Sequence, residues 1–231
     1  ALGGQVDAGY EPITAGRPAG ELMHRTGWAT VFRQPATAEA ARAAMAERER
    51  HGWAVRWLAG GELHARIPGL ARDVAAAAEI PGIRMCSDPA AFVERLAGDV
   101  QAAGGAVEAQ RVVDLRVQGD GVRVATPDGA MVADHVVVAA GVASEALAAD
   151  LGDRLGLVAE RGYHAMLGSR EGGPPMPIMS GEHKFVTTPM AAGVRLAGTS
   201  EFARADRPAD PRRVELLLEH GRALFPGLAT G

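Results

Sequence analysis

An apolar run that ends in glycine carries the clearest chemical signal in this sequence. Residues 135–141 read His-Val-Val-Val-Ala-Ala-Gly, and Ser144 follows three residues later. A continuous apolar run of this length predicts a strand buried on both faces. Because glycine lacks a Cβ, another group can approach the backbone at this end of the run closely. The alternative is a plain parallel strand followed by a helix that Ser144 caps.

The other residues that often do chemistry show no catalytic or metal-binding pattern. Six histidines stand at no ligand spacing, whereas a zinc site needs about four converging ligands. They are His24, His51, His64, His135, His183 and His220. The single cysteine, Cys86, excludes an internal disulfide and indicates a reducing compartment. We expect an inert thiol there rather than a nucleophile.

Composition narrows the class of protein. The 231 residues are 47% hydrophobic and 23% charged, which suits one large domain or two small ones. A net charge of −4 argues against nucleic acid as the main partner, because phosphate binding favours a basic surface. No apolar run approaches the ~20 residues of a transmembrane segment. We therefore expect a cytoplasmic protein, free or at the periphery of the inner membrane, with an oligomeric state that the sequence leaves open.

Hydrophobic periodicity and capping residues predict the elements of the first hundred residues. Residues 1–20 show no period and predict an irregular arm. Pro35 and Gly52 bracket a helix, and Asp88-Pro89 opens the clearest helix of the chain. The expected elements are strands at 28–33 and 53–58, and helices at 35–51, 62–68 and 89–103.

The second half of the chain alternates between strand and turn signals. Turns at 119–121 (Gly-Asp-Gly) and 127–129 (Pro-Asp-Gly) predict a three-stranded antiparallel meander. Residues 191–193 predict a hairpin, and Asp210-Pro211 opens a final helix. The strands are expected at 107–117, 121–125, 130–132, 157–167, 184–189 and 194–199. The fold class is therefore α+β (α/β mixed), with a mainly antiparallel sheet, flanking helices, the meander and one buried strand.

Residues 104–151 resemble part of a flavoprotein of the glutathione-reductase type. In that family a Gly-Gly/Ala-x-Val strand leads into a meander, and a buried strand ending in Ala-x-Gly returns to the dinucleotide-binding sheet. Here Gly105-Ala106-Val107, the turns at Gly121 and Gly129, and residues 134–144 stand in the same order.

Further motifs narrow the resemblance to the D-amino-acid dehydrogenases and oxidases, the DAO superfamily. They are residues 25–28 (Arg-Thr-Gly-Trp), 87–89 (Ser-Asp-Pro), 160–164 (Glu-Arg-Gly-Tyr-His), 184–189 (Lys-Phe-Val-Thr-Thr-Pro) and 195–202 (Arg-Leu-Ala-Gly-Thr-Ser-Glu-Phe). The resemblance implies FAD as cofactor and a small amino acid, of D-configuration in the dehydrogenases, as substrate. It also implies hydride transfer from the α-carbon to the flavin, giving an imino acid that hydrolyses.

The resemblance assigns roles to particular residues, and each role has a structural alternative. The implied cofactor contacts are Val112, Ala140 and Gly141, and the implied substrate contacts are Tyr163, His164, Lys184 and Phe185. The alternative for Val112 is a plain strand valine. For Tyr163 and His164 it is a core tyrosine beside a surface histidine, and for Lys184 and Phe185 it is hairpin packing. For Arg195 and Glu201 we expect cross-strand charge pairing rather than a ligand. No catalytic dyad and no metal site is expected.

The resemblance also predicts the domain organisation. Residues 1–105 and 156–231 correspond to the substrate side, and residues 106–155 to part of the FAD-binding domain. The family's Gly-x-Gly-x-x-Gly turn and its Arg-Pro segment, whose arginine grips the substrate carboxylate, are not found in this sequence. We therefore expect the central portion of a longer enzyme, inactive by itself and without stable FAD binding.

Two other classes stay open. A flavin hydroxylase or halogenase shares the sheet and meander, but it predicts an Asp-Gly motif before the last flavin strand, which is not seen. A non-enzymatic binding module is the other, supported by the missing dinucleotide fingerprint. A flavin absorption band in the purified full-length protein would exclude it.

Overall fold

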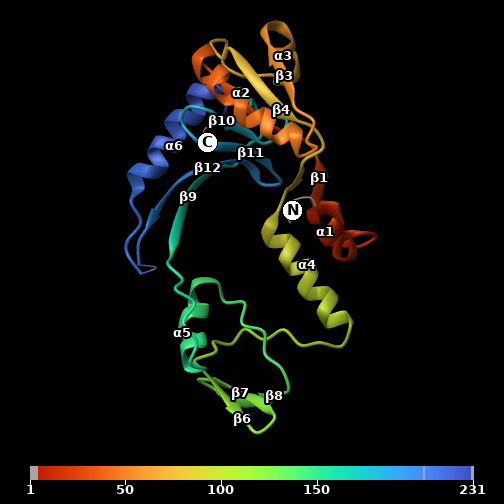
Figure 1. Ribbon diagram of the computed structural model, residues 1–231, viewed down its shortest axis with the longest axis vertical. Coiled ribbons are helices and arrows are strands. Elements are labelled where there is room, and N and C mark those ends of the chain that lie inside the picture. The colour runs from red at the N-terminus through yellow and green to blue at the C-terminus, as the bar shows by residue number, and fades with distance from the viewer. Residues whose placement is uncertain (1–4, 205, 230–231) are drawn as a thin grey trace. The chain divides into compact units, whose positions relative to one another are not determined.

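The computed structural model describes residues 5–204 and 206–229, which form two compact units (Figure 1). The larger unit is drawn from residues 5–103, 162–200 and 209–229, and the smaller unit from residues 104–161 and 201–208. The chain therefore passes between them four times, at 103/104, 161/162, 200/201 and 208/209. Among the described residues, no helix has both the length and the apolar character needed to cross a membrane.

A seven-stranded sheet organises the larger unit (Figure 1). In spatial order its strands are β3 (Arg56–Ala59), β4 (Ala76–Ile80), β2 (Trp28–Phe32), β10 (Ile178–Ser180), β11 (Val186–Met190), β12 (Gly193–Phe202) and β9 (Glu160–Leu167). β2 and β10 run parallel, whereas β3–β4, β2–β4, β10–β11 and β11–β12 run antiparallel. The mainly antiparallel sheet predicted from the sequence is confirmed.

One face of this sheet carries the main core. Along β9 the buried residues alternate with exposed ones, so that Tyr163, Ala165 and Leu167 face the core together. Two helices cover this face: α3 (Gly60–Arg66), which contributes Leu63, and α6 (Pro211–Leu224), which contributes Leu217. Burying each such leucine side chain stabilises the fold by about 2 kcal/mol.

Helix α2 (Pro35–Arg50) covers part of the opposite face. Pro35 stands in its first turn, and Gly52, at a φ of +85°, lets the chain leave the helix after His51. Its Ala38 and Met45 pack on Phe32 of β2 and on Ala78 of β4 in a second, smaller core. This core lies over β2, β4 and β3, at one end of the sheet.

The N-terminal residues fold into helices, and the predicted irregular arm is wrong for the part that the structure describes. Residues 1–4 lie outside the described residues, while α1 (Val6–Thr14) and the 3-10 helix η2 (Pro18–Leu22) follow. Gly9 and Pro12 are poor helix residues. Tertiary contacts outweigh that preference: Tyr10 packs edge-on against Phe92, with ring centroids 6.2 Å apart.

Helix α4 (Pro89–Ala102) begins as the sequence predicts. The Asp88 carboxylate accepts a hydrogen bond from the backbone N–H of Ala91 at 3.0 Å, and Pro89 occupies the first helical position. A two-stranded antiparallel sheet of β1 (Met23–Arg25) and β5 (Arg84–Cys86) leads into it.

The smaller unit contains the predicted meander. It consists of β6 (Asp114–Gln118), β7 (Gly121–Thr126) and β8 (Gly129–Ala133), paired antiparallel in that order. The 3-10 helix η3 (Gly141–Ala143) and the helix α5 (Ser144–Asp150) follow.

The predicted buried strand at residues 135–141 is wrong for this structure. Residues 135–140 form no strand, and Val137 is 88% exposed. An apolar run becomes a buried strand only when neighbouring strands pair its backbone groups. Within the described part of the chain no strand pairs with this segment, so its apolar side chains are partly or fully exposed instead of buried between strands.

A buried carboxylate ties the far end of the large sheet together. Glu79 of β4 is 1% exposed, and its two oxygens accept hydrogen bonds from Arg56 of β3 and Arg66 of α3. Burial alone raises the pKa of Glu79, but the hydrogen bonds and charges of Arg66 and Arg56 outweigh burial and hold the pKa below its usual value.

We predict that Glu79→Gln lowers the free energy of unfolding by about 3 kcal/mol, because it leaves two guanidinium groups without their shared anion. Since the folded-state pKa is depressed, the contribution is present above the ordinary value of 4.5 and is lost as the pH falls below it. Urea unfolding at pH 7 and at pH 4 measures both effects. The exposed Glu49→Gln serves as the matched control, and equal stability of the two variants at pH 7 contradicts the prediction.

Candidate functional site

The smaller unit contains a cavity of about 670 Å³. Its walls come from the segment before β6, from the apolar segment 136–140, and from α5. The lining residues are Gln110, Arg111, Val112, Val113, Leu115, Val124, Val136, Val137, Val138, Ala139, Ala140, Ala143, Ala146, Leu147 and Asp150. Two of the predicted cofactor contacts, Val112 and Ala140, therefore line one cavity, although 28 positions separate them in the sequence.

Gly141 does not line this cavity but turns the chain beside it. Its φ of +58° lies in the left-handed region that favours glycine, and a Cβ built there meets no atom within 4 Å. The backbone N–H of Ala140 donates to Oγ of Ser144 at 3.1 Å. The Ser144 hydroxyl therefore accepts a hydrogen bond from the residue four positions before it instead of capping α5. The N–H of Ala140 already has this hydroxyl as its partner.

The polar residues of the cavity were not predicted from the sequence. Arg111 and Asp150 both line it and carry opposite charges. Arg111 precedes the predicted contact Val112, and Asp150 ends α5. The amphipathic spacing of Ala143, at the end of η3, and of Ala146, Leu147 and Asp150 along α5 was the available signal for this wall.

Tyr163 lies in the core of the larger unit. It is 7% exposed, and its phenolic oxygen accepts a hydrogen bond from the backbone N–H of Asp210 at 3.0 Å. The guanidinium of Arg213 lies over its ring, 5.4 Å from the centroid. Tyr163 thereby anchors the start of α6, where the Asp210 carboxylate also accepts from the amide of Arg212.

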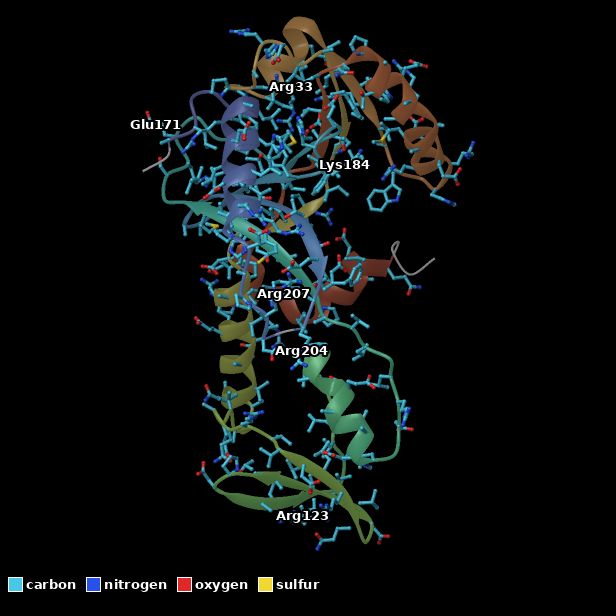
Figure 2. All side chains as sticks on the ribbon, turned by 90° about the vertical axis from the view of Figure 1, so that its left-hand side faces the viewer. Arg33, Arg123, Glu171, Lys184, Arg204 and Arg207 are labelled. Carbon is cyan, nitrogen blue, oxygen red and sulfur yellow. The ribbon has the colours of Figure 1, made fainter. Side chains whose placement is uncertain are left out.

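The predicted substrate residues are divided between the two sides of the sheet. His164 is exposed on the face opposite Tyr163, because successive residues of a strand point to opposite faces. Phe185 is 1% exposed within the main core. Lys184 (Figure 2) is exposed in the turn two positions before β11 begins. His164 and Lys184 are thus accessible to a ligand, whereas Tyr163 and Phe185 are buried.

The backbone around Lys184 is unusual. Lys184 and Thr199 are the only non-glycine residues with positive φ in the described chain, at 55° and 56°. For a β-branched residue such as Thr199 this is a rare conformation. Gly198, next to Thr199, lets the backbone of β12 lie close to Phe185. A Cβ at position 198 would stand only 2.7 Å from Cβ of Phe185.

The cross-strand charge pairing predicted for Arg195 and Glu201 of β12 is found for only one of these two residues. Glu201 forms an ion pair with Arg161 of β9 at 3.5 Å, so cross-strand pairing is confirmed for Glu201. Arg195 is half-buried on β12, and no carboxylate of the described residues lies within ion-pair range of it. The predicted pairing is therefore wrong for Arg195.

Two histidines meet beside Phe185. The rings of His183 and His220 stack with centroids 3.9 Å apart, and the ring of Phe185 lies 5.9 Å from His220. Burial lowers the pKa of His220, the charge of His183 lowers it further, and Glu219 acts in the opposite direction. No group of three or more histidine, cysteine or acidic side chains in the described parts of the chain could hold a metal ion.

We predict that the native state loses stability as the pH falls below about 6.5, the ordinary histidine value. The folded-state pKa of His220 is lowered, so the stabilisation is complete above 6.5 and is lost through protonation below it. His220→Gln should flatten the stability profile between pH 7 and pH 5. Thermal unfolding measures it, with the exposed His135→Gln as control, and an unchanged profile in His220→Gln contradicts the prediction.

Comparison with known proteins places this arrangement in a family. Residues 15–231 match the family model of the FAD dependent oxidoreductases (DAO). A D-amino-acid oxidase of Bradyrhizobium diazoefficiens is 34% identical over 186 residues, which cover 77% of this chain and 44% of that protein. D-amino acid dehydrogenase 2 of Ralstonia nicotianae is 31% identical over 225 residues, which cover 87% of this chain and 50% of that protein.

Solved structures show the same fold. Glycine oxidase from Geobacillus kaustophilus superimposes with a TM-score of 0.81 at 24% identity, over 96% of this chain and 60% of that chain. The chain spans about half the length of the two curated relatives described above. Because the family model matches residues 15–231, the chain belongs to the FAD-dependent oxidoreductase family.

Proposed function

We propose that the protein oxidises the carbon–nitrogen bond of a small amino acid in an FAD-dependent reaction, with D-amino acids as the preferred class. The observation that carries this proposal is the match over residues 15–231, together with a D-amino-acid oxidase and a D-amino acid dehydrogenase among the relatives. The amino acid loses a hydride from its α-carbon and a proton from its nitrogen, and water then hydrolyses the resulting imine. FAD supplies the hydride acceptor.

The cavity of the smaller unit supports a role in holding part of the cofactor. Its walls at Val112 and Ala140 are apolar and suit the flat face of a base, and Arg111 supplies a cation suited to phosphate. The open space at Gly141 lets a ligand approach the backbone closely. We assign Val112, Ala140 and Gly141 to cofactor binding on this basis, and residues 106–155 to the FAD-binding domain.

The larger unit supplies the substrate side in this proposal. His164 and Lys184 are accessible and are assigned to substrate contact. Tyr163 and Phe185 act indirectly, because Tyr163 fixes the start of α6 and Phe185 packs beneath the Lys184 turn. In this proposal the accessible side chains of His164 and Lys184 orient the substrate.

Composition and the free thiol support a type of substrate and a cellular compartment. The net charge of −4 supports a small-molecule substrate instead of nucleic acid, and the unpaired Cys86 supports a reducing compartment. We place the protein in the cytoplasm, free or at the periphery of the inner membrane.

The function is tested with the protein expressed from its complete reading frame. We expect a flavin absorption band that bleaches under anaerobic conditions on addition of D-alanine or other D-amino acids, with release of ammonia in turnover. The L-enantiomers serve as the control for configuration. A flavin band that no amino acid bleaches contradicts the proposal, and so does the absence of flavin from a folded preparation.

The cofactor assignment is tested separately at Gly141. Gly141→Val introduces a β-branched side chain beside the cavity, so we expect flavin content to fall by at least half, as measured by the ratio of flavin to protein absorbance. Gly156→Val is the matched control, because Gly156 also has a positive φ, of 68°, with open space around it, and does not adjoin the cavity. Equal flavin loss in both variants indicates backbone strain alone and contradicts the assignment.

A further inference from the structure

A turn at residues 181–184 lies between β10 and β11 and ends in Lys184 (Figure 2). The backbone N–H of Lys184 donates to the carbonyl oxygen of Ser180 at 3.0 Å, and the N–H of His183 donates to Oγ of Ser180 at 3.1 Å. Lys184 has a φ of 55°, which residues other than glycine rarely adopt. Such a conformation persists where the surrounding structure fixes it, so the position of Lys184 depends on what packs against the turn.

Hydrogen bonds fix the first half of this turn. The N–H of Gly181 donates to the carbonyl oxygen of Val31 in β2 at 2.8 Å. The carboxylate of Glu182 accepts from the backbone N–H of Arg33 at 3.0 Å and from that of Gln34 at 3.3 Å, between β2 and α2. The first half of the turn is therefore tied to the sheet and to the start of α2.

A pair of aromatic rings fixes the second half of the turn. His183 stacks on His220 of α6, with ring centroids 3.9 Å apart and ring planes inclined by 20°. His220 comes three residues after the buried Leu217 and four before the buried Leu224, so it lies on the side of α6 that meets the main core. Because the core holds α6 in place, the ring of His220 gives His183 a fixed surface.

The elements packed around the two rings also carry charged side chains. They are Glu182 and Lys184 of the turn, Glu219 of α6, and Arg33, which donates to the carbonyl oxygen of Ala223 in α6 and pairs with Asp73. Glu182 already accepts two amide hydrogen bonds, and Asp73 already has its ion pair. Glu219 is therefore the acid of this set that acts on the pair, and it raises the pKa of His220 against the lowering effect of burial.

Protonation changes the contact between the two rings. Neutral imidazole rings pack favourably at this spacing, whereas two protonated rings 3.9 Å apart repel each other. Imidazole is the side chain that changes its charge between about pH 5 and pH 8. Acidification therefore separates the turn from α6, while the hydrogen bonds of Gly181 and Glu182 remain. The half of the turn that loses its contact is the half that ends in Lys184.

We propose that His183 and His220 are positioning residues for Lys184, held together as a stacked pair at neutral pH and separated when both rings are protonated. The proposal rests on the proposed function and deepens it, because Lys184 is the residue of this turn assigned to substrate contact. The intact stack presents the Lys184 side chain in one orientation. Loss of the stack lets that side chain move, so substrate binding weakens as the solution is acidified.

The experiment uses the protein from its complete reading frame, with flavin bound, and measures KM and kcat for D-alanine at pH 7.5 and pH 5.5. His183→Phe keeps an aromatic ring against His220 but cannot be protonated. We expect the rise in KM at pH 5.5 to be about fivefold larger in wild type than in His183→Phe, with similar kcat in the two proteins. Any change in the charge of D-alanine itself affects both proteins equally. His51→Phe, which replaces an exposed histidine of the same unit, is the matched control and should follow wild type.

Two further variants keep the proposal falsifiable. His220→Phe should lose the pH dependence in the same way as His183→Phe, and His183→Gln, which removes the stacked ring, should raise KM already at pH 7.5. The same dependence of KM on pH in wild type, His183→Phe and His220→Phe overturns the proposal. If neither phenylalanine variant folds, an unchanged KM at pH 7.5 in His183→Gln overturns it.

Failure of the proposed function gives a different result. If no amino acid reduces the bound flavin of wild type, the proposed function fails, and amide hydrogen exchange then tests the position of Lys184 by itself. Corrected for the intrinsic effect of pH, protection of the Lys184 N–H should fall between pH 7.5 and pH 5.5 in wild type and stay constant in His183→Phe. Equal loss of protection in both proteins, or no loss in wild type, overturns the proposal.

Discussion

The two-residue period of β9, β11 and β12 is the constraint on which the larger unit depends. Alternate residues of these strands enter one core beneath α3 and α6, so the intervening residues are forced onto the other side. Tyr163 and His164 are neighbours in sequence but face opposite sides for this reason. A one-residue shift of register would exchange the two sets and bury Arg195 without a partner. The same packing that stabilises the fold therefore decides which side chains can meet a ligand.

Ion pairs stabilise the sheet at the positions where its strands carry charged side chains. Glu79 is buried beneath two arginines at one end of the sheet, and Glu201 pairs with Arg161 at the other. These pairs compensate charge that strands would otherwise bring out of water. Arg195 on β12 has no such partner among the described residues.

Local signals in the sequence predicted much of the fold. Asp88 and Asp210 cap their helices as expected, and the turns at 119–121 and 191–193 produce the meander and the hairpin. These features depend on a few adjacent residues, so one sequence suffices to find them. The apolar segment 135–140 was predicted to be a strand and is not, because a strand depends on partners that periodicity does not reveal. The ion pair predicted for Arg195 also depended on distant residues, and among the described residues it does not form.

The four passages of the chain between the two units have a consequence for biosynthesis. Residues 201–208 belong to the smaller unit, although residues 162–200, which precede them, belong to the larger one. During translation the smaller unit therefore lacks its last segment until most of the chain has emerged from the ribosome. The larger unit also awaits α6, which supplies Leu217 and Leu224 to its core. Neither unit can finish folding vectorially, so the nascent chain keeps apolar surface exposed until late in synthesis.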